Sequence, residues 1–382
     1  MNASVDAARE SESLVRDAAR GFVAAHHSMQ RVRQMRTAQT GYSREVWMAL
    51  AEAGWLGLRV PESQGGAGLG IAEVAVLCDV FGEVLLPEPF IVCGLIPPLL
   101  VAGSNPSPLR SRLLPDIMAG RSILTLAWQE APLHFQADRC EAALTGTGGN
   151  LRLNGTKRFV MSAVGADGYL VTCVRGGQFA LAFVPSCGAG ISVRGDRQID
   201  GSVCADIAFR DVALATDHIL AEGEQARSLV NSAIAEATLA VCATLTAVAN
   251  CALRISVDYM NTRMQFGKLI GSFQALQHRA VDLAVRCTLA GAAMRRALEE
   301  HAAGSARAPA DLSAAKAICS RTATLVTRTA IQLHGGIGYT DEAEIGLYLK
   351  SALRFAGYLG TAHAHRGRFM ALKQSADQYS SG

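Results

Sequence analysis

A long helical segment without interruption constrains the fold of this chain most strongly. Residues 226–264 run for almost 40 positions without glycine or proline, and residues 272–302 and 308–333 continue the helical pattern. At about 1.5 Å per residue, the first segment predicts a helix approaching 60 Å, longer than one compact domain usually needs. Long apolar helices bury their surface in a four-helix bundle and often in a subunit interface. The last third therefore predicts an oligomeric helical bundle.

The same segment is the most apolar part of the chain, so a membrane span has to be considered. Its most apolar stretch, residues 239–253, is about 15 residues long and is interrupted by Thr244, Thr246 and Asn250. A bilayer span needs roughly 20 apolar residues. We interpret the segment as a buried helix of the bundle.

The other two thirds of the chain have different patterns. Residues 1–120 read as short helices, such as the one predicted after an N-cap at Ser43, with a glycine-rich loop at residues 60–70 and a proline-punctuated connection at 87–107. Residues 121–222 contain short β-prone runs at the spacing of an antiparallel sandwich or barrel. The pattern predicts three domains: helical at 1–120, β at 121–222 and helical at 223–382.

Charge and composition exclude several classes of function. The chain has 382 residues, 36 Lys plus Arg against 33 Asp plus Glu, and no run of five like charges, which argues against a nucleic-acid track or a polybasic membrane arm. Residues 1–20 lack the basic and apolar regions of a secretory signal, so we expect a cytoplasmic protein. The ten cysteines have no metal-site spacing, and we expect them to be reduced and mostly buried, with no metal bound.

Three short segments could carry chemistry. R-x-x-F-G-K at residues 263–268 can clamp a diphosphate and stack an adenine, although cations also suit a helix C-terminus. Q-L-H-G-G-I-G-Y at 332–339 allows backbone N–H groups to approach a ligand, although it could simply end a helix. N-G-T-K-R-F-V-M-S at 154–162 reads as a hairpin turn followed by a strand.

Together and in this order, the three segments resemble the acyl-CoA dehydrogenase family of flavoproteins. The resemblance extends over nearly the whole chain and includes V-P-E-S-Q-G-G-A-G-L-G at 60–70 and F-R-D-V-A-L at 209–214. It implies an α+β fold: an N-terminal helical domain, a central antiparallel β domain and a C-terminal four-helix bundle that tetramerises. It also implies FAD-dependent α,β-dehydrogenation of an acyl-CoA thioester to the trans-2-enoyl-CoA, with electrons passing to an electron-transferring flavoprotein.

The resemblance assigns roles to particular residues. Arg263 and Phe266 would hold the diphosphate and adenine of an FAD bound mainly by a neighbouring subunit, and Ile270, Phe273 and Leu276 would add adenine contacts. The residues that would cradle the diphosphate across the dimer interface are Gln332, Gly335, Gly336 and Gly338. Thr361 would approach the flavin, and the β domain would contribute Trp128, Phe159, Met161 and Ser162, with Phe159 in place of the usual tryptophan. Glu130 lies on the same strand as Trp128.

The catalytic base is the point at which the sequence departs from the family. A carboxylate must remove the α-proton, and its commonest position, just before a Gly-Thr pair, is Leu359 here. The alternative position on the long helix is Ala237. Its neighbour Glu236 would fit only if the helix were locally over- or underwound, because one residue turns a helix by about 100°. As the base, Glu236 would be a buried glutamate with a raised pKa. A solvent-facing or ion-paired Glu236 is the alternative.

Two further functions stay open. The chain could be the partner without a base in an α2β2 acyl-CoA dehydrogenase, in the branch that handles bulky acyl groups such as steroid side chains, which the H-G-G-I-G-Y-T-D-E wording resembles. It could instead be a flavin monooxygenase on the same fold, with His363 or His365 near the site. A binding or scaffold protein without flavin is the remaining possibility.

Overall fold

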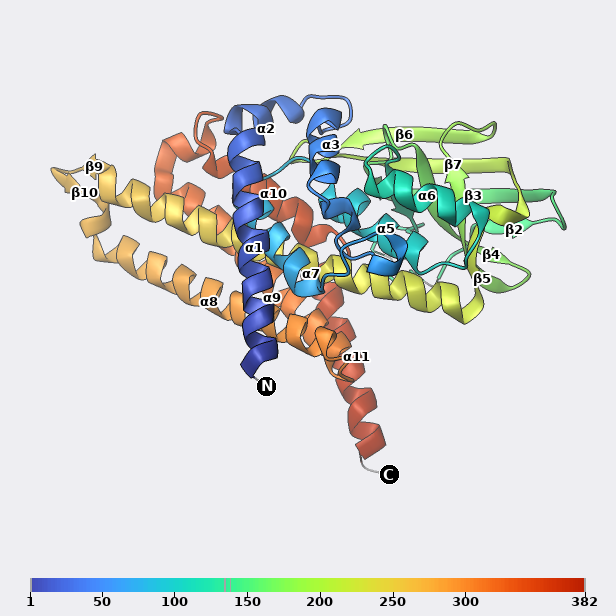
Figure 1. Cartoon of the computed structure of the whole chain (residues 1–382). Coiled ribbons are helices and arrows are strands. Elements are labelled where there is room, and N and C mark those ends of the chain that lie inside the picture. Colours follow the sequence, from blue (N-terminus) through green and yellow to red (C-terminus); the bar gives the residue numbers. More distant parts are fainter. Residues whose placement is uncertain (1, 134, 138, 381–382) are drawn as a thin grey trace. The chain divides into compact units, whose positions relative to one another are not determined.

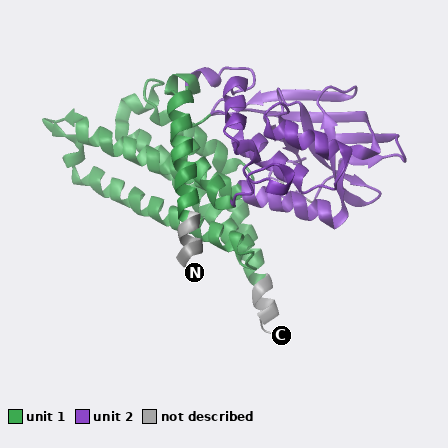
Figure 2. Ribbon diagram, viewed as in Figure 1, with its two compact units in different colours: residues 1–32, 71–86, 238–382 green, residues 33–70, 87–237 purple. Residues whose placement is uncertain are grey.

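The protein is described here from a computed structural model. The model describes residues 2–133, 135–137 and 139–380, with the side chains of residues 2–8 and 375–380 excepted. The chain divides into two compact units (Figure 2). Unit 1 consists of Met1–Val32, Ile71–Leu86 and Thr238–Gly382, and unit 2 consists of Arg33–Gly70 and Pro87–Ala237. The three predicted domain boundaries stay a prediction.

Unit 1 is helical (Figure 1). Its α-helices are α1 (Asn2–His26), α4 (Ile71–Glu83), the part of α7 (Gly223–Thr262) that follows Ala237, α8 (Gln274–Ala302), α9 (Ala308–His334), α10 (Ile345–Gly357) and α11 (Ala362–Ser380). Between them lie β9 (Met264–Gln265), β10 (Lys268–Leu269), η5 (Ile270–Ser272) and η6 (Gly335–Tyr339). The predictions of three long helices after residue 223 are confirmed.

Helix α7 is a core helix, as its sequence predicts. It is long and apolar enough to span a membrane, but 83% of its most apolar 18-residue window is buried. Thr244 and Thr246 turn their hydroxyls back to the carbonyls of Ala240 and Cys242, so these polar groups are satisfied within the helix. Because most of this apolar window is buried, its side chains do not need charges to be compatible with water.

Unit 2 combines short helices with one sheet. Its helical elements are α3 (Arg44–Glu52), η1 (Trp55–Gly57), η2 (Glu62–Gln64), η3 (Phe90–Leu95), α5 (Ile96–Ala102), α6 (Pro108–Met118) and η4 (Thr216–His218), and α2 (Met29–Met35) crosses from unit 1. The strands are β1 (Leu124–Ala127), β2 (Ala143–Thr145), β3 (Leu151–Met161), β4 (Gly168–Arg175), β5 (Gln178–Pro185), β6 (Ile191–Arg197), β7 (Val203–Leu214) and β8 (Ile219–Glu222).

The eight strands form a single sheet in the order β6-β7-β3-β2-β4-β5-β8, with β1 paired to β4. The pairings β1 with β4 and β2 with β4 are parallel, and the remaining pairings are antiparallel. A core of alternating strand residues, including Leu153, Val171 and Ile207, is fully buried. The α+β fold expected from the sequence is confirmed, but the sheet is mixed and not purely antiparallel, because β1 and β2 each pair in parallel with β4.

Two local predictions are wrong. The proline-rich segment 87–107 is not only a connection, because Phe90–Leu95 forms a π-helical turn and Ile96–Ala102 an α-helix. Its first turn contains Pro97 and Pro98, where no intrahelical N–H is required. Asn154–Gly155 is not a hairpin turn, because β3 runs straight through it with a bulge. Glycine is needed at 155 because a Cβ there would lie 2.7 Å from the Cα of Ala142.

Candidate functional site

The R-x-x-F-G-K segment forms an exposed hairpin at the end of α7. Strands β9 and β10 pair antiparallel, and the turn between them places Phe266 and Gly267 at positive φ, 52° and 75°. The Phe266 side chain is 91% exposed, and its ring meets Phe273 edge-on at 6.3 Å. The Lys268 ammonium lies 4.3 Å from the Phe273 ring centre. The hairpin thus presents an aromatic and cationic tip outside the bundle.

The glycine-rich segment follows α9 and is held against the same end of α7. The His334 ring stacks on Tyr259 at 4.5 Å, and its Nδ1 donates to the carbonyl of Ala330. Gly335 adopts φ 66° and ψ −141°, a conformation reserved for glycine, and open space surrounds both Gly335 and Gly336. Gly338 is buried instead. A larger residue would not fit there, because a Cβ would lie 2.7 Å from the carbonyl oxygen of Ile331. The stack therefore joins the last turns of α7, which lead into the R-x-x-F-G-K hairpin, to the end of α9, which leads into the glycine-rich segment. The resemblance assigns both segments to the FAD diphosphate.

The adenine contacts assigned on the hairpin side differ in exposure. Ile270 is buried at 9% exposure, whereas Phe273 and Leu276 are partly exposed, and Gln332 is exposed on α9. Arg263 is exposed, with its backbone held between the carbonyl of Tyr259 and the N–H of Ile270. All these residues belong to unit 1. Their exposed surfaces face away from the bundle core and are free to meet a ligand.

Thr361 lies in a short loop between α10 and α11 that buried groups fix in place. The Lys316 ammonium donates to the carbonyls of Phe355, Ala356 and Gly360, at 3.1, 3.2 and 2.9 Å. His365 Nε2 donates to the carbonyl of Leu359 at 3.0 Å. Burial lowers the pKa of Lys316 to about 8 and that of His365 to about 4. The hydroxyl of Thr361 caps α11 through the N–H of Ala364.

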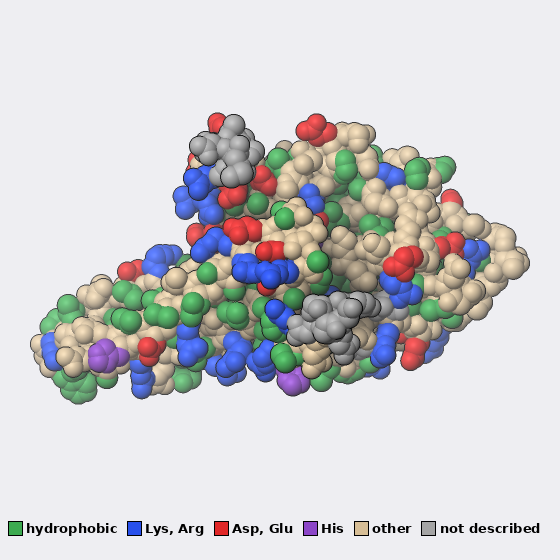
Figure 3. Space-filling model, turned by 90° about the horizontal axis from the view of Figure 1, so that it is seen from below, with side chains coloured by type: hydrophobic (Ala, Val, Ile, Leu, Met, Phe, Trp, Pro, Cys, Tyr) green, Lys and Arg blue, Asp and Glu red, His purple; other side chains and the backbone are tan. Residues whose placement is uncertain are grey.

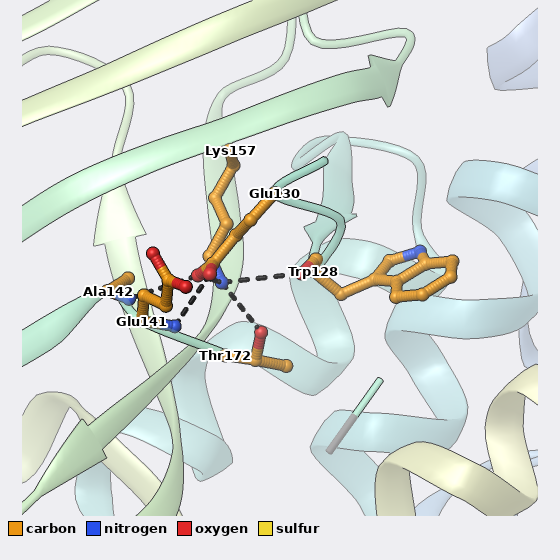
Figure 4. A network of polar contacts seen from close by, with 6 residues as sticks. All are labelled: Trp128, Glu130, Glu141, Ala142, Lys157 and Thr172. Carbon is orange, nitrogen blue, oxygen red and sulfur yellow. Dashed lines mark hydrogen bonds and ion pairs between the residues drawn. The ribbon is translucent and has the colours of Figure 1, made fainter. Parts of the chain in front are cut away.

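A buried ion pair holds the backbone beside the predicted flavin residue Trp128 (Figure 4). Trp128 and Glu130 follow the end of β1, so the prediction that they lie on a strand is wrong. Lys157 Nζ lies 2.6 Å from Glu130 Oε1 and 2.9 Å from the Thr172 hydroxyl, and it also reaches the carbonyl of Trp128 at 3.4 Å. The Glu130 carboxylate accepts hydrogen bonds from the backbone N–H groups of Glu141 and Ala142. The Trp128 indole points away from this network. The pair ties the segment after β1 to the middle of β3.

Beyond Lys157 the strand bulges and turns Phe159 outward. Phe159 adopts φ 54° and is 45% exposed, and Ser162 adopts φ 55°, so both non-glycine residues lie in the left-handed region. Met161 is buried, and its carbonyl accepts from the hydroxyl of Thr125 at 2.7 Å. Left-handed backbone at non-glycine residues costs free energy and gathers at functional sites. Seven described non-glycine residues have positive φ. Phe159, Ser162, Phe266 and Leu359 fall in segments to which the sequence assigned flavin or base positions, whereas Leu85, Leu133 and Asp211 do not.

Glu236 is buried in an ion pair inside unit 2. Its carboxylate accepts hydrogen bonds from Arg59 Nε at 2.8 Å and from Arg59 Nη2 at 2.6 Å, and its side chain is 7% exposed. Arg59 Nη1 also donates to the carbonyl of Leu69 at 2.6 Å. The pair therefore fastens the glycine-rich loop of residues 60–70 to the first part of α7. No local pattern in the sequence points to Arg59, because it lies 177 positions from its partner.

The two positions at which the resemblance places the catalytic base hold apolar side chains. Ala237 is fully buried and Leu359 is 5% exposed. Leu359 nevertheless sits at φ 58° in the loop that Lys316 and His365 hold. Gly360 beside it cannot be larger, because a Cβ would lie 2.6 Å from His365 Nε2. Sequence reasoning missed Lys316, although a lone lysine among the small apolar residues of 308–333 was a detectable signal.

The residues present fit a flavin dinucleotide. In unit 1, an exposed arginine and aromatic ring with an open glycine backbone beside them offer a clamp for diphosphate and a stacking surface for adenine. In unit 2, the outward Phe159 offers an exposed aromatic surface. The site includes no carboxylate at either expected base position.

Comparison with known proteins gives consistent matches. A family model described as "Acyl-CoA dehydrogenase, N-terminal domain" matches residues 9–121, and one described as "Acyl-CoA dehydrogenase, C-terminal domain" matches residues 219–371. Acyl-CoA dehydrogenase IpdE2 of Mycolicibacterium smegmatis is 28% identical over 92% of this chain and 95% of its own length. Acyl-CoA dehydrogenase FadE27 of Mycobacterium tuberculosis is 27% identical over 86% of this chain and 88% of its own length.

Solved structures agree in fold. A Tcur3481-Tcur3483 steroid ACAD variant has a TM-score of 0.87 and 26% identity, covering 97% of this chain and 99% of that chain. The ChsE4-ChsE5 complex from Mycobacterium tuberculosis has a TM-score of 0.84 and 24% identity, covering 96% of each.

Proposed function

The chain belongs to the acyl-CoA dehydrogenase family, flavin oxidoreductases that act on CH–CH bonds, and on that premise we propose how its residues serve acyl-CoA dehydrogenation. In this reaction the Cα–Cβ bond of an acyl-CoA thioester becomes a trans double bond. A carboxylate takes the proton from Cα, and a bound flavin would supply the acceptor for the hydride that leaves Cβ. The thioester carbonyl must be hydrogen-bonded so that the α-proton becomes acidic.

We propose FAD as the flavin, held in part across a subunit interface. One observation carries this proposal: the R-x-x-F-G-K hairpin and the glycine loop lie together at one end of unit 1, joined by the Tyr259–His334 stack, with Arg263 and Phe266 directed outward. The Phe266 side chain is 91% exposed and therefore buries little apolar surface within its own chain. A dinucleotide bound mainly by a second subunit accounts for the outward side chains of Arg263 and Phe266. We propose contacts with the flavin ring for Phe159, Met161, Ser162 and Trp128 of unit 2 and, as a separate assignment, for Thr361 of unit 1.

The first of two candidates for the base is this chain's own Glu236. It is buried on α7, next to the position that the family uses on this helix. To act as a base, its carboxylate would have to leave Arg59, which now donates to both of its oxygens. Arg59 would then move with the Gly-rich loop, whose Leu69 carbonyl it also holds.

A second candidate is a subunit that lacks its own base and works in a mixed oligomer. The Arg59–Glu236 pair favours this candidate, because both oxygens of the Glu236 carboxylate are already occupied by hydrogen bonds from Arg59. Leu359 and Ala237 favour it too, since neither expected position offers another acid. The Tcur3481-Tcur3483 relative carries two protein names, as a mixed enzyme would. We propose that this chain pairs with a related subunit that supplies the glutamate.

The remaining assignments follow from the same family. We propose an electron-transferring flavoprotein as the electron acceptor, a homotetramer or α2β2 tetramer as the assembly, bulky acyl groups such as steroid side chains as the acyl class, and the cytoplasm as the location. The buried α7 supports a protein without a membrane anchor in this helix. A monooxygenase gains no support from His365, because its ring is buried and holds the Leu359 carbonyl.

FAD retention tests the shared-site proposal. The chain is purified, loaded with FAD, and passed over a sizing column while flavin absorbance is recorded. We expect flavin to elute only with an oligomer, and Arg263→Ala to lower FAD affinity by about tenfold or more, since an arginine bonded to phosphate is worth about 1.5–3 kcal/mol. Arg307→Ala, at an exposed arginine at the start of α9, is the matched control. Flavin that elutes with a monomer would contradict the proposal.

A further inference from the structure

A β-bulge gives Phe159 its outward position. Residues 157–160 of β3 span the same stretch of the sheet as residues 205–207 of β7, so Arg158 and Phe159 together lie opposite Asp206. Such a bulge leaves one residue of the longer strand without a partner residue in the ladder, and its backbone groups need other hydrogen bonds. How these groups are satisfied therefore decides where the Phe159 ring lies.

Without the bulge, the ring would point into the core of the sheet. Side chains of a regular strand alternate between its two faces, so Phe159 would share the face of Lys157. Lys157 is fully buried, Phe159 is 45% exposed, and Val160 takes the next buried position. The extra residue thus shifts the alternation by one place. It puts the ring on the exposed face, where we propose its contact with the flavin.

The two N–H groups of the bulge have separate acceptors. The Arg158 N–H donates to the carbonyl of Gln129 at 2.7 Å. The Phe159 N–H donates to Oδ1 of Asp206 at 3.3 Å. Gln129 follows Trp128 in the segment after β1, so the first bond ties the bulge to another predicted flavin residue. The second bond depends on a single carboxylate.

Two arginines hold the Asp206 carboxylate in place. Its Oδ2 accepts a hydrogen bond from Nη2 of Arg194 at 3.0 Å, and Nη1 of Arg158 lies 3.7 Å from the same oxygen. Arg194 is the residue of β6 directly opposite Asp206, and Arg158 belongs to the bulge. The carboxylate therefore bridges three strands, with one oxygen for the backbone of β3 and the other for the arginines.

An arginine beside an acid is not by itself a signal on this protein. Acidic and basic side chains lie next to one another on the face shown in Figure 3, and exposed ion pairs contribute little. Asp206 differs because its side chain is only 20% exposed and because it binds the N–H of a residue with φ 54°. Since the Phe159 side chain is half exposed, its own packing does little to hold this left-handed backbone.

We propose that Asp206 is a positioning residue for the flavin ring. Its carboxylate holds the bulge in the conformation that directs Phe159 outward, while Arg158 and Arg194 fix the carboxylate. This inference rests on the proposed contact between Phe159 and the flavin, and it names the group that sets this aromatic surface in place. Loss of Asp206 should release the ring and keep the fold, since Asp206 lies on the face of β7 opposite to its buried neighbours at 205 and 207.

A tryptophan at position 159 reports where the ring lies. An indole in contact with a flavin quenches the flavin fluorescence by electron transfer. Phe159→Trp, which introduces the usual residue of the family, should therefore shorten the fluorescence lifetime of bound FAD relative to wild type. The chain's three own tryptophans are present in every variant and supply the baseline. Lifetimes are recorded on the FAD-loaded protein, because they do not depend on the fraction of protein that carries FAD.

The Phe159→Trp background then carries changes at position 206. Asp206→Leu removes the carboxylate and keeps the size of the side chain. A hydrogen bond to a charged acceptor is strong enough that we expect the ratio of the long to the short lifetime component to rise by about tenfold. Asp206→Asn keeps an acceptor oxygen for the N–H of residue 159 and should restore much of the short component. Asp196→Leu, the same change at an exposed carboxylate of β6, should have no effect.

The outcomes separate the inference from the proposed flavin contact. If Phe159→Trp leaves the lifetime unchanged, position 159 does not contact the flavin, and both the contact and the inference fail. If Phe159→Trp shortens the lifetime and Asp206→Leu leaves it short, the contact stands and Asp206 does not position the ring. Circular dichroism establishes folding. Should Asp206→Leu not fold, Arg158→Gln/Arg194→Gln, at two exposed arginines, replaces it, and an unchanged ratio there overturns the inference.

Discussion

The most buried charge in the sheet unit, Lys157, decides how firmly the predicted flavin wall is held. Its side chain is completely buried and its ammonium is matched by Glu130, whose exposure is 11%. Removing one member of a buried ion pair leaves the other charge uncompensated and costs about 3–5 kcal/mol. We expect Lys157→Met to lower the free energy of unfolding by this amount, measured by urea denaturation. Lys373→Met, at an exposed lysine of α11, should change it by less than about 0.5 kcal/mol.

In the same measurement, the double variant Lys157→Met/Glu130→Met should recover part of the loss, because no charge is then left buried alone. A double variant that is less stable than Lys157→Met would show that the backbone hydrogen bonds to Glu130 matter more than the ion pair.

A second residue-scale prediction concerns pH. Burial holds the pKa of His365 at about 4, and its Nδ1 has no hydrogen-bond partner among the described residues. The unfolded chain binds a proton on this histidine near pH 6.5, whereas the folded chain does not until about pH 4. The contribution of His365 to the free energy of unfolding is therefore fully present above pH 6.5. It is lost as the pH drops toward 4, by up to about 3 kcal/mol.

His365→Gln should flatten this part of the stability curve, followed by chemical denaturation at several pH values. His363, which is exposed on the same helix, provides the control, since His363→Gln should leave the slope unchanged. An unchanged slope in His365→Gln would mean that other groups titrate in this range.

At the scale of elements, one ion pair fastens the glycine-rich loop to α7. Arg59→Met and Glu236→Met should each destabilise the protein by about 3–5 kcal/mol, and the double variant by clearly less than their sum. Thermal or urea unfolding gives the coupling energy, which we expect at about 1–3 kcal/mol. The exposed pair Arg121–Asp116 should give no more than about 1 kcal/mol in the same cycle. If the losses of unfolding free energy in the two single variants were additive, the Arg59–Glu236 pair would have no structural role of this kind.

The elements also show what sequence reasoning can and cannot reach. The three long helices, the N-cap at Ser43, whose hydroxyl accepts from the N–H of Val46, and the glycine-rich turns followed from local patterns. The prediction of a connection at 87–107 is wrong because prolines in a first helical turn resemble those in a loop. The prediction of a hairpin turn at Asn154–Gly155 is wrong because a β-bulge and a turn favour the same residue types.

Partners far apart in the chain left no local trace in the sequence. Arg59 bonds to Glu236 across 177 positions, and Lys316 bonds to Gly360 across 44. Counting along the sequence places Glu236 one residue from an expected base position, but it does not reveal the arginine that binds the carboxylate. The roles of the FAD residues remain predictions, supported by the exposure of Phe266 and by the stack that joins the two segments.

At the scale of the whole molecule, cofactor and assembly should depend on each other. If FAD binds between subunits and not to isolated chains, it stabilises the oligomer by mass action. We expect the melting temperature of the FAD-free protein to rise with added FAD and with protein concentration, measured by calorimetry. A melting temperature that rises with FAD but is independent of protein concentration would indicate a site complete within one chain.

The source of the base is the central claim, and anaerobic bleaching of bound FAD tests it most directly. Short, branched and steroid-like acyl-CoAs are added to the FAD-loaded chain alone, to Glu236→Gln and to Leu359→Glu, which places a carboxylate at the family's commonest base position. The account predicts no bleaching by wild type or Glu236→Gln and bleaching by Leu359→Glu. Bleaching by wild type that Glu236→Gln abolishes would contradict it, and would make the chain a complete dehydrogenase with its base on α7.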